Sequence, residues 1–273
     1  MTTRAKPAQP ENQPNARGEF RSHGVVFLAF VALVALFYAP VLLGRRTLSV
    51  GDFTDHFFPF SLFLRSELLA GRLPLWNPFT YGGHPFLADI QAGVFYPINL
   101  LLLAIATPFG SDATRLYFLQ IEALLQIVLA GFFTYLLVRS LTGRPLAAFL
   151  AGGIFALSGY LTGYPALQLA ILRVAIWLPL VLWLLLQAFD RPRRWRWWIA
   201  AALAYAVAFL AGHPQTFLHL SYAVLAWIAL LLFKERRGRP EEMAVSGYLL
   251  RIGLFYLLFA GLIAAQLLSL IHI

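Results

Sequence analysis

Two aspartates, Asp52 and Asp55, lie three residues apart in the segment SVGDFTDHFFPF, directly after the first long apolar run. His56 follows the second of them. Carboxylates beside an imidazole can act as a general base with a supporting acid, or can hold a divalent metal ion. In a helix, this spacing places both aspartates on neighbouring positions of one face. The segment is therefore the first candidate for a catalytic site.

The same residues also fit a structural role. Asp52 follows Gly51 and precedes the helix-like stretch FTDHFFPFSLFLRSELLAG, so its side chain could cap the N-terminus of a helix. Asp55 would then lie in the first turn, where the helix dipole favours an acidic side chain. The spacing alone does not decide between capping and catalysis.

The elements that must position these residues are apolar helices. The chain has 273 residues, of which 60% are hydrophobic and 12% are charged, whereas soluble domains carry about 25% charged residues. Apolar runs of crossing length predict an all-helical polytopic membrane protein with about seven transmembrane helices. The predicted helices are Val25–Leu43, Leu116–Val138, Leu146–Tyr164, Ala170–Phe189, Trp197–Gly212, Thr216–Phe233 and Tyr248–Leu268.

Basic residues predict how these helices are oriented. Clusters precede the first helix and follow the second, fourth and sixth: Arg4, Lys6, Arg17 and Arg21, then Arg139 and Arg144, then DRPRRWRWW and KERRGRPEE. With the amino terminus in the cytoplasm, every cluster is cytoplasmic, as the positive-inside rule requires. Residues 44–115 then form a long first outer loop that carries the acidic pair. This distribution accounts for the net charge of +9 without nucleic acid, which we exclude as a partner.

One apolar segment would reverse this orientation if it crossed the membrane. Residues 93–110, GVFYPINLLLLAIATPFG, contain Pro97 and Pro108 and have a short unbroken apolar core. If they crossed, every later arginine cluster would face outward, against the positive-inside rule. We therefore expect an interfacial or re-entrant helix here. Residues 1–24 are polar and predict a disordered cytoplasmic tail, and residues 25–268 form one transmembrane domain.

The first-loop block resembles the start of the bacterial YfhO-type membrane proteins, which belong to the GT-C class of polytopic glycosyltransferases. The resemblance covers nearly all of the chain after the tail, and the first loop is its specific part. The residues that carry it are Gly51-Asp52, Pro59-Phe60, GRLPLWNP (Gly71–Pro78), Gly82-Gly83 with Pro85, Ala88 to Gln91 leading to FYP, WLPL (Trp177–Leu180) and AGHPQT (Ala211–Thr216).

The resemblance implies transfer of a sugar from a polyprenyl-phosphate donor to an envelope polymer or lipid acceptor. The reaction would take place on the outer face of the bacterial cytoplasmic membrane. In this class an aspartate of the first outer loop is the usual catalytic carboxylate, and Asp52 occupies that position with Asp55 in support. Any divalent metal ion would be held by these two aspartates. If Asp52 does not carry the reaction, Asp89 or Glu67 is the next candidate.

Cations and hydrogen-bonding groups are needed around the leaving polyprenyl phosphate, which is an anion. Arg65 and Arg72 fit equally well as side chains that reach toward lipid headgroups. We expect His219 to be a buried packing residue. Candidate substrate-binding residues are His56, Arg65, Arg72, His84, Asp89, Gln91, Arg115, Arg173 and His213, and the cluster Trp195, Trp197 and Trp198 predicts an interfacial belt.

Other readings remain open. Glu122 lies inside the second predicted helix, where an ionised side chain costs roughly 2.5–3.5 kcal/mol on insertion scales. It could be the coupling residue of a transporter or lipid flippase, or it could be satisfied by a hydrogen bond between helices. A non-catalytic relative that keeps the glycosyltransferase fold is a third reading. The end of the chain, LSLIHI, resembles translated sequencing adapter, so we interpret residues 269–273 as an artefact and expect the natural chain, here a fragment, to continue.

Overall fold

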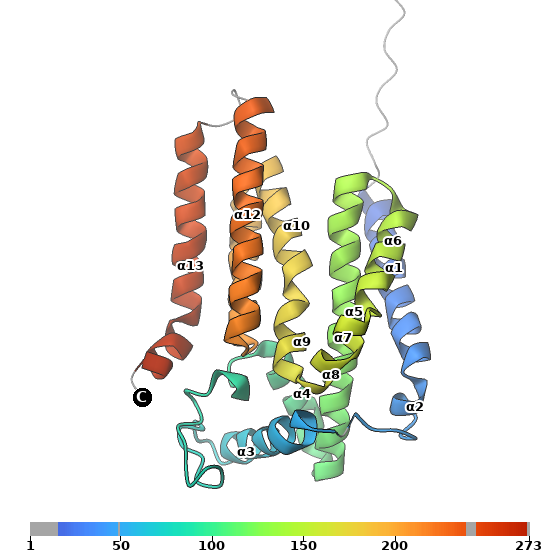
Figure 1. Cartoon of the computed structure of the whole chain (residues 1–273), viewed down its shortest axis with the longest axis vertical. Helices are drawn as coiled ribbons and strands as arrows, with labels where there is room; N and C mark the ends of the chain where they lie inside the picture. The colour runs from blue at the N-terminus through green and yellow to red at the C-terminus, as the bar shows by residue number, and fades with distance from the viewer. Residues whose placement is uncertain (1–15, 49, 239–243, 272–273) are drawn as a thin grey trace, which may run out of the picture.

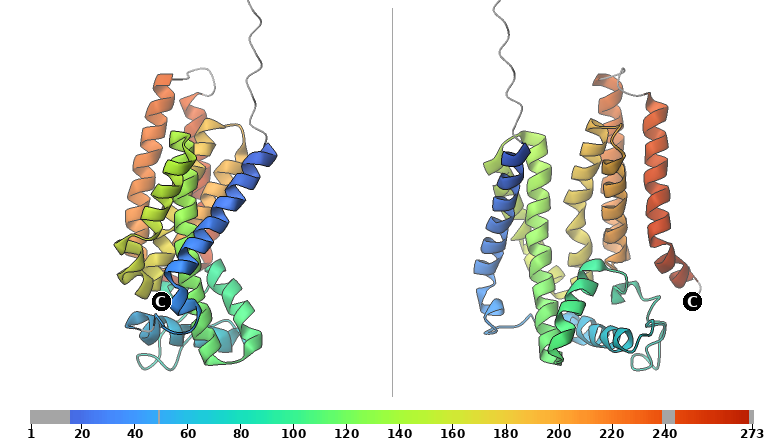
Figure 2. Two further views of the ribbon diagram at one scale, coloured as in Figure 1. Left: turned by 90° about the vertical axis from the view of Figure 1, so that its right-hand side faces the viewer. Right: turned by 180° about the vertical axis from the view of Figure 1, so that it is seen from behind.

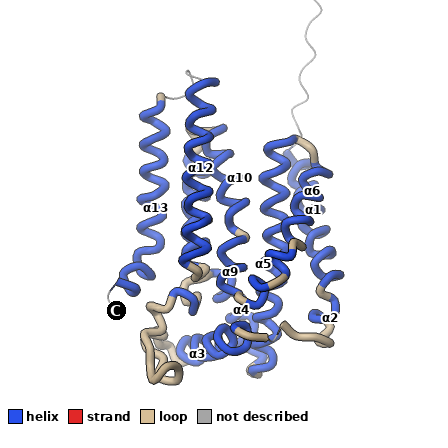
Figure 3. The backbone as a smooth tube through the Cα atoms, viewed as in Figure 1, coloured by secondary structure: helices blue, strands red, loops and turns tan. Residues whose placement is uncertain are grey.

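The computed structural model describes residues 16–48, 50–238 and 244–271. Across these ranges the secondary structure is helical, and the β-bridge between Asn77 and His84 is isolated. Long helices run side by side, and shorter helices and loops gather at one end of them (Figures 1, 2 and 3). The predicted all-helical class is therefore confirmed for the described residues.

Within the described residues, five segments are long and apolar enough to cross a membrane. They are α5 (Asp112–Thr142), α6 (Pro145–Ala156) with α7 (Gly159–Thr162), α9 (Leu169–Ala175) with α10 (Trp177–Asp190), α12 (Pro214–Gly238) and α13 (Val245–Ile271). Helices α1 (Ala16–Phe37) and α11 (Trp195–Leu210) run beside them, but their apolar parts are shorter. The chain is thus a multi-pass helical membrane protein with about five long apolar helices.

Prolines divide two of the helices that the sequence predicts to be continuous. A short α2 (Ala39–Leu42) follows α1 after a break, because Pro40 has no N–H to donate to the preceding turn. Pro179 has the same effect between α9 and α10. A third break lies at Ser158, whose Oγ accepts the backbone N–H of Leu161 at the start of α7.

Helix α1 begins at Ala16, inside the tail that we predicted to be disordered. Residues 16–24 are helical, which corrects that prediction. Alanine, arginine and glutamate are good helix formers, and extending the adjoining apolar helix costs less than nucleating a new one. Residues 1–15 lie outside the described residues. At the other end α13 extends to Ile271, and the last two residues of the segment that we interpreted as adapter are also outside the described ranges.

The segment between α2 and α5 lies at one end of the long helices, which we call the first-loop end (Figure 1). It contains the π-helical turn η1 (Phe53–Phe57), α3 (Phe58–Leu69), the 3₁₀ turn η2 (Ile90–Ala92), α4 (Pro97–Ala106) and the 3₁₀ turn η3 (Thr107–Phe109). Helix α3 lies across the direction of the long helices. The 10 residues of α4 extend about 15 Å, half of a hydrocarbon core of about 30 Å. Helix α4 is therefore too short to cross the membrane, in agreement with the prediction for residues 93–110.

The arginine clusters of the later connections lie at the opposite end, which we call the basic end. The connections α5–α6 and α10–α11 lie there, as do the C-terminal end of α12 and the N-terminal end of α13 (Figures 1 and 2). The two connections carry Arg144 and residues 191–196 among others. One end of the protein therefore holds the acidic pair and the other holds the basic clusters. That the basic end faces the cytoplasm is the prediction of the positive-inside rule.

Single cysteines are expected to report this orientation, because the chain has none of its own. We expect Phe79→Cys, at an exposed position of the first-loop end, to react in intact cells with a membrane-impermeant maleimide. Arg194→Cys should react only after the membrane is permeabilised, and Arg144→Cys at the same end is the matched control. Labelling of positions 79 and 194 from the same side would show that residues 93–110 cross the membrane.

Candidate functional site

Asp52 does not cap a helix. It precedes η1 with helical backbone angles, φ −55° and ψ −24°, and its side chain makes no capping hydrogen bond. Its Oδ2 instead accepts a hydrogen bond of 2.6 Å from Nε2 of Gln168, which lies between α8 (Tyr164–Leu167) and α9. The carboxylate is exposed at the first-loop end. The capping alternative is therefore wrong for Asp52.

The turn that carries the acidic pair is π-helical, a rare conformation that occurs often at functional sites. Asp55 is exposed, and within the described ranges its carboxylate has no hydrogen bond or ion pair. In the same ranges no three His, Asp or Glu side chains converge as ligands for a metal ion. In the described ranges, no side-chain contact therefore links the Asp55 carboxylate to Asp52. A metal ion bound by Asp52 and Asp55 would have no third His, Asp or Glu ligand there.

His56 within this turn lies close to His84 and to a third aspartate, Asp89. The ring of His56 is 4.0 Å from that of Phe60, and the Phe60 ring stacks on His84 at 5.5 Å. Nε2 of His84 lies 3.7 Å from Oδ2 of Asp89, an ion pair when the imidazole is protonated. The structure therefore brings His56, His84 and Asp89 together, as residues of one cluster around a buried phenylalanine.

The buried aromatic cluster and the nearby carboxylates shift the pKa of His56. Burial lowers the pKa of His56 below its ordinary value of 6.5, and the carboxylates of Asp89 and Asp52 partly oppose this shift. The same interactions place Asp52 within electrostatic reach of the imidazole. A histidine that stays neutral near pH 7 can accept a proton or a hydrogen bond, which makes His56 a candidate base beside Asp52.

The lowered pKa of His56 predicts a loss of stability in acid. The unfolded chain binds the proton at about pH 6.5, before the folded chain does, so stability is complete above this pH and falls as the pH drops toward the folded pKa. We expect thermal unfolding in detergent to show a smaller acid loss for His56→Phe than for the parent chain between pH 7.5 and 5. Identical pH profiles for the two proteins would contradict this.

Arg173 does not lie at the outer surface. Its side chain is 2% exposed, and its Nε donates a hydrogen bond of 2.6 Å to Oε1 of Glu122, which is fully buried. The guanidinium also lies over the rings of Phe57 and Tyr96, at 5.9 and 5.4 Å. Arg173 is thus a buried cation that joins α9 to α5 and to the π-helical turn, and it gives Glu122 a partner.

Arg115 is a second buried cation in the same interior. Its Nη2 donates to Oδ1 of Asn99 at 2.9 Å, while its Nε and Nη1 have no hydrogen-bond partner among the described residues. Arg65, Arg173 and Glu122 are close enough to act on it electrostatically. An unpaired buried donor is costly. Two guanidiniums and one carboxylate therefore leave an excess of positive charge beside the turn that carries Asp52.

Arg65 and Arg72 have partners near the surface. Both Nε and Nη2 of Arg72 donate to the carboxylate of Glu67, at 2.9 and 2.6 Å, in an exposed pair. Nη1 of Arg65 lies 4.0 Å from the carboxylate of Asp112, and its Nη2 donates to the carbonyl of Thr107 at 3.5 Å. Arg72 and Glu67 thus neutralise each other, and Arg65 connects α3 to the start of α5.

The turn between α11 and α12 packs directly on the first loop. Oδ1 of Asp89 accepts the backbone N–H of Gln91 at 2.9 Å and so caps η2. A Cβ on Gly212 would lie 2.3 Å from the carbonyl oxygen of Ile90, and the φ of Gly212 is +97°. Only glycine fits this position. The contact holds the turn that contains His213 against Ile90 and Gln91 of the first loop.

His213 lines a cavity of about 440 Å³ at the first-loop end. Burial lowers the pKa of His213, and its Nδ1 accepts the backbone N–H of Thr216 at 3.2 Å. The other lining residues come from α7, α9 and α12: Gly159, Tyr160, Ile171, Gln215, Thr216 and His219. His219 is exposed here, so its prediction as a buried packing residue is wrong. Gln168, the partner of Asp52, directly precedes α9, which contributes to this cavity.

Sequence reasoning missed Gln168. Its signal was a polar amide in the short connection GYPALQLA, on the side where the first loop was predicted.

The tryptophan belt also needs correction. Trp198 is buried and packs on Phe189 at 5.3 Å between ring centroids, while Trp195 remains exposed.

Comparison with protein-family models, with curated proteins and with solved structures found no match to this chain.

Proposed function

We propose that this protein is a membrane glycosyltransferase with Asp52 as its catalytic carboxylate. It would move a sugar from a polyprenyl-phosphate donor to a cell-envelope acceptor at the first-loop end. One observation carries the proposal: the carboxylate of Asp52 is exposed and held by Gln168 from a distant segment, instead of capping its own helix. A GT-C arrangement of seven spans, which counts α1 and α11, belongs to the proposal, as does the outer face of the bacterial cytoplasmic membrane.

The chemistry needs a base and a site for an anionic leaving group. The acceptor hydroxyl attacks the anomeric carbon and loses its proton, while the bond from that carbon to the phosphate oxygen breaks. In the proposed reaction, Asp52 takes the proton and the amide of Gln168 keeps the carboxylate oriented. The polyprenyl phosphate leaves with its added negative charge, next to the positive interior formed by Arg115 and Arg173.

The cavity at His213 supports the binding of a small polar molecule. Its volume of about 440 Å³ lies within the usual range of about 300–1,000 Å³ for ligand pockets. Histidine, glutamine, threonine and tyrosine side chains line it, and these can donate and accept hydrogen bonds with sugar hydroxyls. We assign the sugar or its acceptor to this cavity.

The transporter reading depends on Glu122 as a coupling residue. In the structure the Glu122 carboxylate is hydrogen-bonded to Arg173 at 2.6 Å, so a structural ion pair accounts for this intramembrane acid. The geometry favours the enzyme because it gives Asp52, and not Glu122, the exposed position at the end of the helices.

The test is sugar transfer by the full-length protein in proteoliposomes. A donor with a radiolabelled sugar on a short polyprenyl phosphate is supplied together with an envelope lipid extract as acceptor. We expect labelled acceptor and free polyprenyl phosphate to appear together. A flippase would move the donor across the bilayer with its sugar–phosphate bond intact, and a non-catalytic relative would do neither; both results would refute the proposal.

A further inference from the structure

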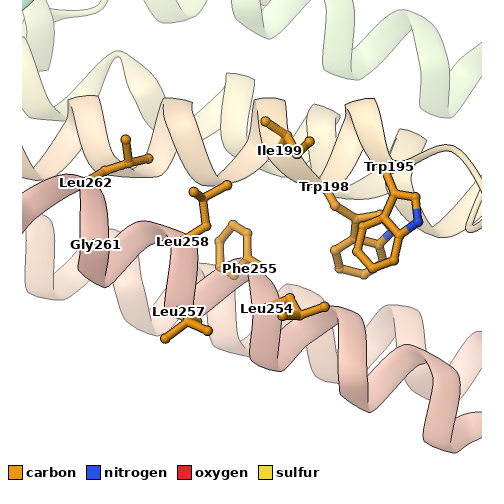
Figure 4. A pocket seen from close by; sticks show the side chains of 9 residues that line it. All are labelled: Trp195, Trp198, Ile199, Leu254, Phe255, Leu257, Leu258, Gly261 and Leu262. Carbon is orange, nitrogen blue, oxygen red and sulfur yellow. The ribbon is translucent and has the colours of Figure 1, made fainter.

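Helices α11 and α13 leave an apolar groove of about 480 Å³ between them near the basic end. Figure 4 shows Phe255 and Leu258 of α13 pointing toward α11. Leu254 and Leu258 are each 37% exposed, so the groove is open along its side. The lining residues are Trp195, Trp198 and Ile199 from α11, and Leu254, Phe255, Leu257, Leu258, Gly261 and Leu262 from α13.

Arginines lie close to Trp195, the lining residue of the groove that is nearest the basic end. Arg193 and Arg194 are exposed in the connection before Trp195. Together with Asp190, Arg191 and Pro192 they line a second hollow of about 270 Å³, where three arginines outnumber one carboxylate. The guanidinium of Arg251 lies over the Trp195 ring at 4.7 Å, and its Nε donates to the carbonyl of Pro192 at 2.9 Å. Arg251 therefore contacts a lining residue of the groove, and Arg193 and Arg194 directly precede that residue in the chain.

We propose that this groove binds a membrane phospholipid with an anionic headgroup. The headgroup phosphate contacts Arg193 and Arg194, and one acyl chain lies between α11 and α13. Basic pockets between transmembrane helices are known to hold anionic headgroups. Trp195 marks the level of the membrane interface, where tryptophan is enriched. The site lies at the end opposite to Asp52, so it does not depend on the proposed sugar transfer.

The length of the groove favours an acyl chain over a helix from a second copy. The stretch of α13 from Leu254 to Leu262 is about 12 Å long. One leaflet contributes about half of a hydrocarbon core of about 30 Å, or about 15 Å. A packed transmembrane helix would need a contact surface along the whole core. A groove that extends from the interface over one leaflet matches the chain of a lipid in that leaflet.

Lipid binding to the purified full chain tests the cationic part of the site. Native mass spectrometry is used to titrate phosphatidylglycerol, phosphatidylcholine and inorganic phosphate. We expect phosphatidylglycerol to bind at least tenfold more tightly than phosphatidylcholine. Arg193→Gln with Arg194→Gln should weaken phosphatidylglycerol by about 25-fold, at about fivefold per arginine. It should weaken phosphatidylcholine much less, because the choline cation offsets the charge of its phosphate. Arg144→Gln, exposed at the same end, is the matched control and should have no effect.

A second variant tests the apolar part. Gly261 lines the groove, and a Cβ there meets no atom within 4 Å, so we use Gly261→Leu to occupy the groove. It should weaken both phospholipids at least tenfold. Gly253→Leu is the control, because Gly253 is equally open on the same helix but does not line the groove. Equal affinity for the two phospholipids, displacement by inorganic phosphate alone, or unchanged binding in Gly261→Leu would overturn the proposal. A change of oligomeric state in Gly261→Leu would assign the groove to a second copy instead.

Discussion

Asp52→Asn is expected to lower the rate of sugar transfer by at least about 100-fold, the lower range for loss of a positioned general base. Asparagine keeps the size of the side chain and can still accept the hydrogen bond that Gln168 donates to Oδ2. It cannot take the proton of the acceptor hydroxyl. The fold is therefore expected to persist while the chemical step fails, so the loss should appear in kcat and not in the amount of folded protein.

Asp55→Asn is the matched control for this experiment. It removes the same charge three residues away, from an exposed side chain without a partner in the described ranges. Its effect should be much smaller than that of Asp52→Asn. Near-normal transfer by Asp52→Asn at unchanged expression would contradict the assignment. The next candidate would then be Asp89, because it shares the histidine cluster, whereas the carboxylate of Glu67 is already paired with Arg72.

The helical class and the short segment at residues 93–110 could be predicted because both depend on composition. Apolar length defines a crossing helix, and the arginine clusters exclude an extra crossing. The prolines that break two of the helices, Pro40 and Pro179, are visible in the sequence, but the length of an apolar run does not predict such breaks. Proline removes a backbone donor without lowering the hydrophobicity of the run. The predicted segments are therefore helical, but two that were predicted as single helices are broken at prolines.

The partners of the site residues could not be predicted, because they come from distant parts of the chain. Gln168 reaches Asp52 across 116 positions, and Arg173 reaches Glu122 across 51. Such pairs depend on which face of each helix turns inward, and the apolar runs of this chain are hydrophobic on nearly every face. The position of a polar residue within an apolar run indicates its depth in the membrane, but it does not show which polar residues meet.

The buried pair of Glu122 and Arg173 gives the second large expected effect. Glu122→Gln leaves the guanidinium of Arg173, which is 2% exposed, without its anionic partner, and a second cation, Arg115, already lies nearby. Breaking a buried ion pair by removing one partner typically costs about 3–5 kcal/mol. We expect a loss of this size in the free energy of unfolding, measured by denaturant titration in mixed micelles.

The double variant Glu122→Gln with Arg173→Met separates pairing from other roles of the carboxylate. It removes both charges while it keeps side chains of similar length, so its stability should return most of the way toward the parent chain. The exposed pair of Glu67 and Arg72 is the matched control, since water solvates either partner when the other is removed. If Glu122→Gln is as stable as the parent chain, the ion pair is not what holds this acid inside the helices. Glu122 would then need a functional explanation, and the coupling residue of a transporter would be the reading to test.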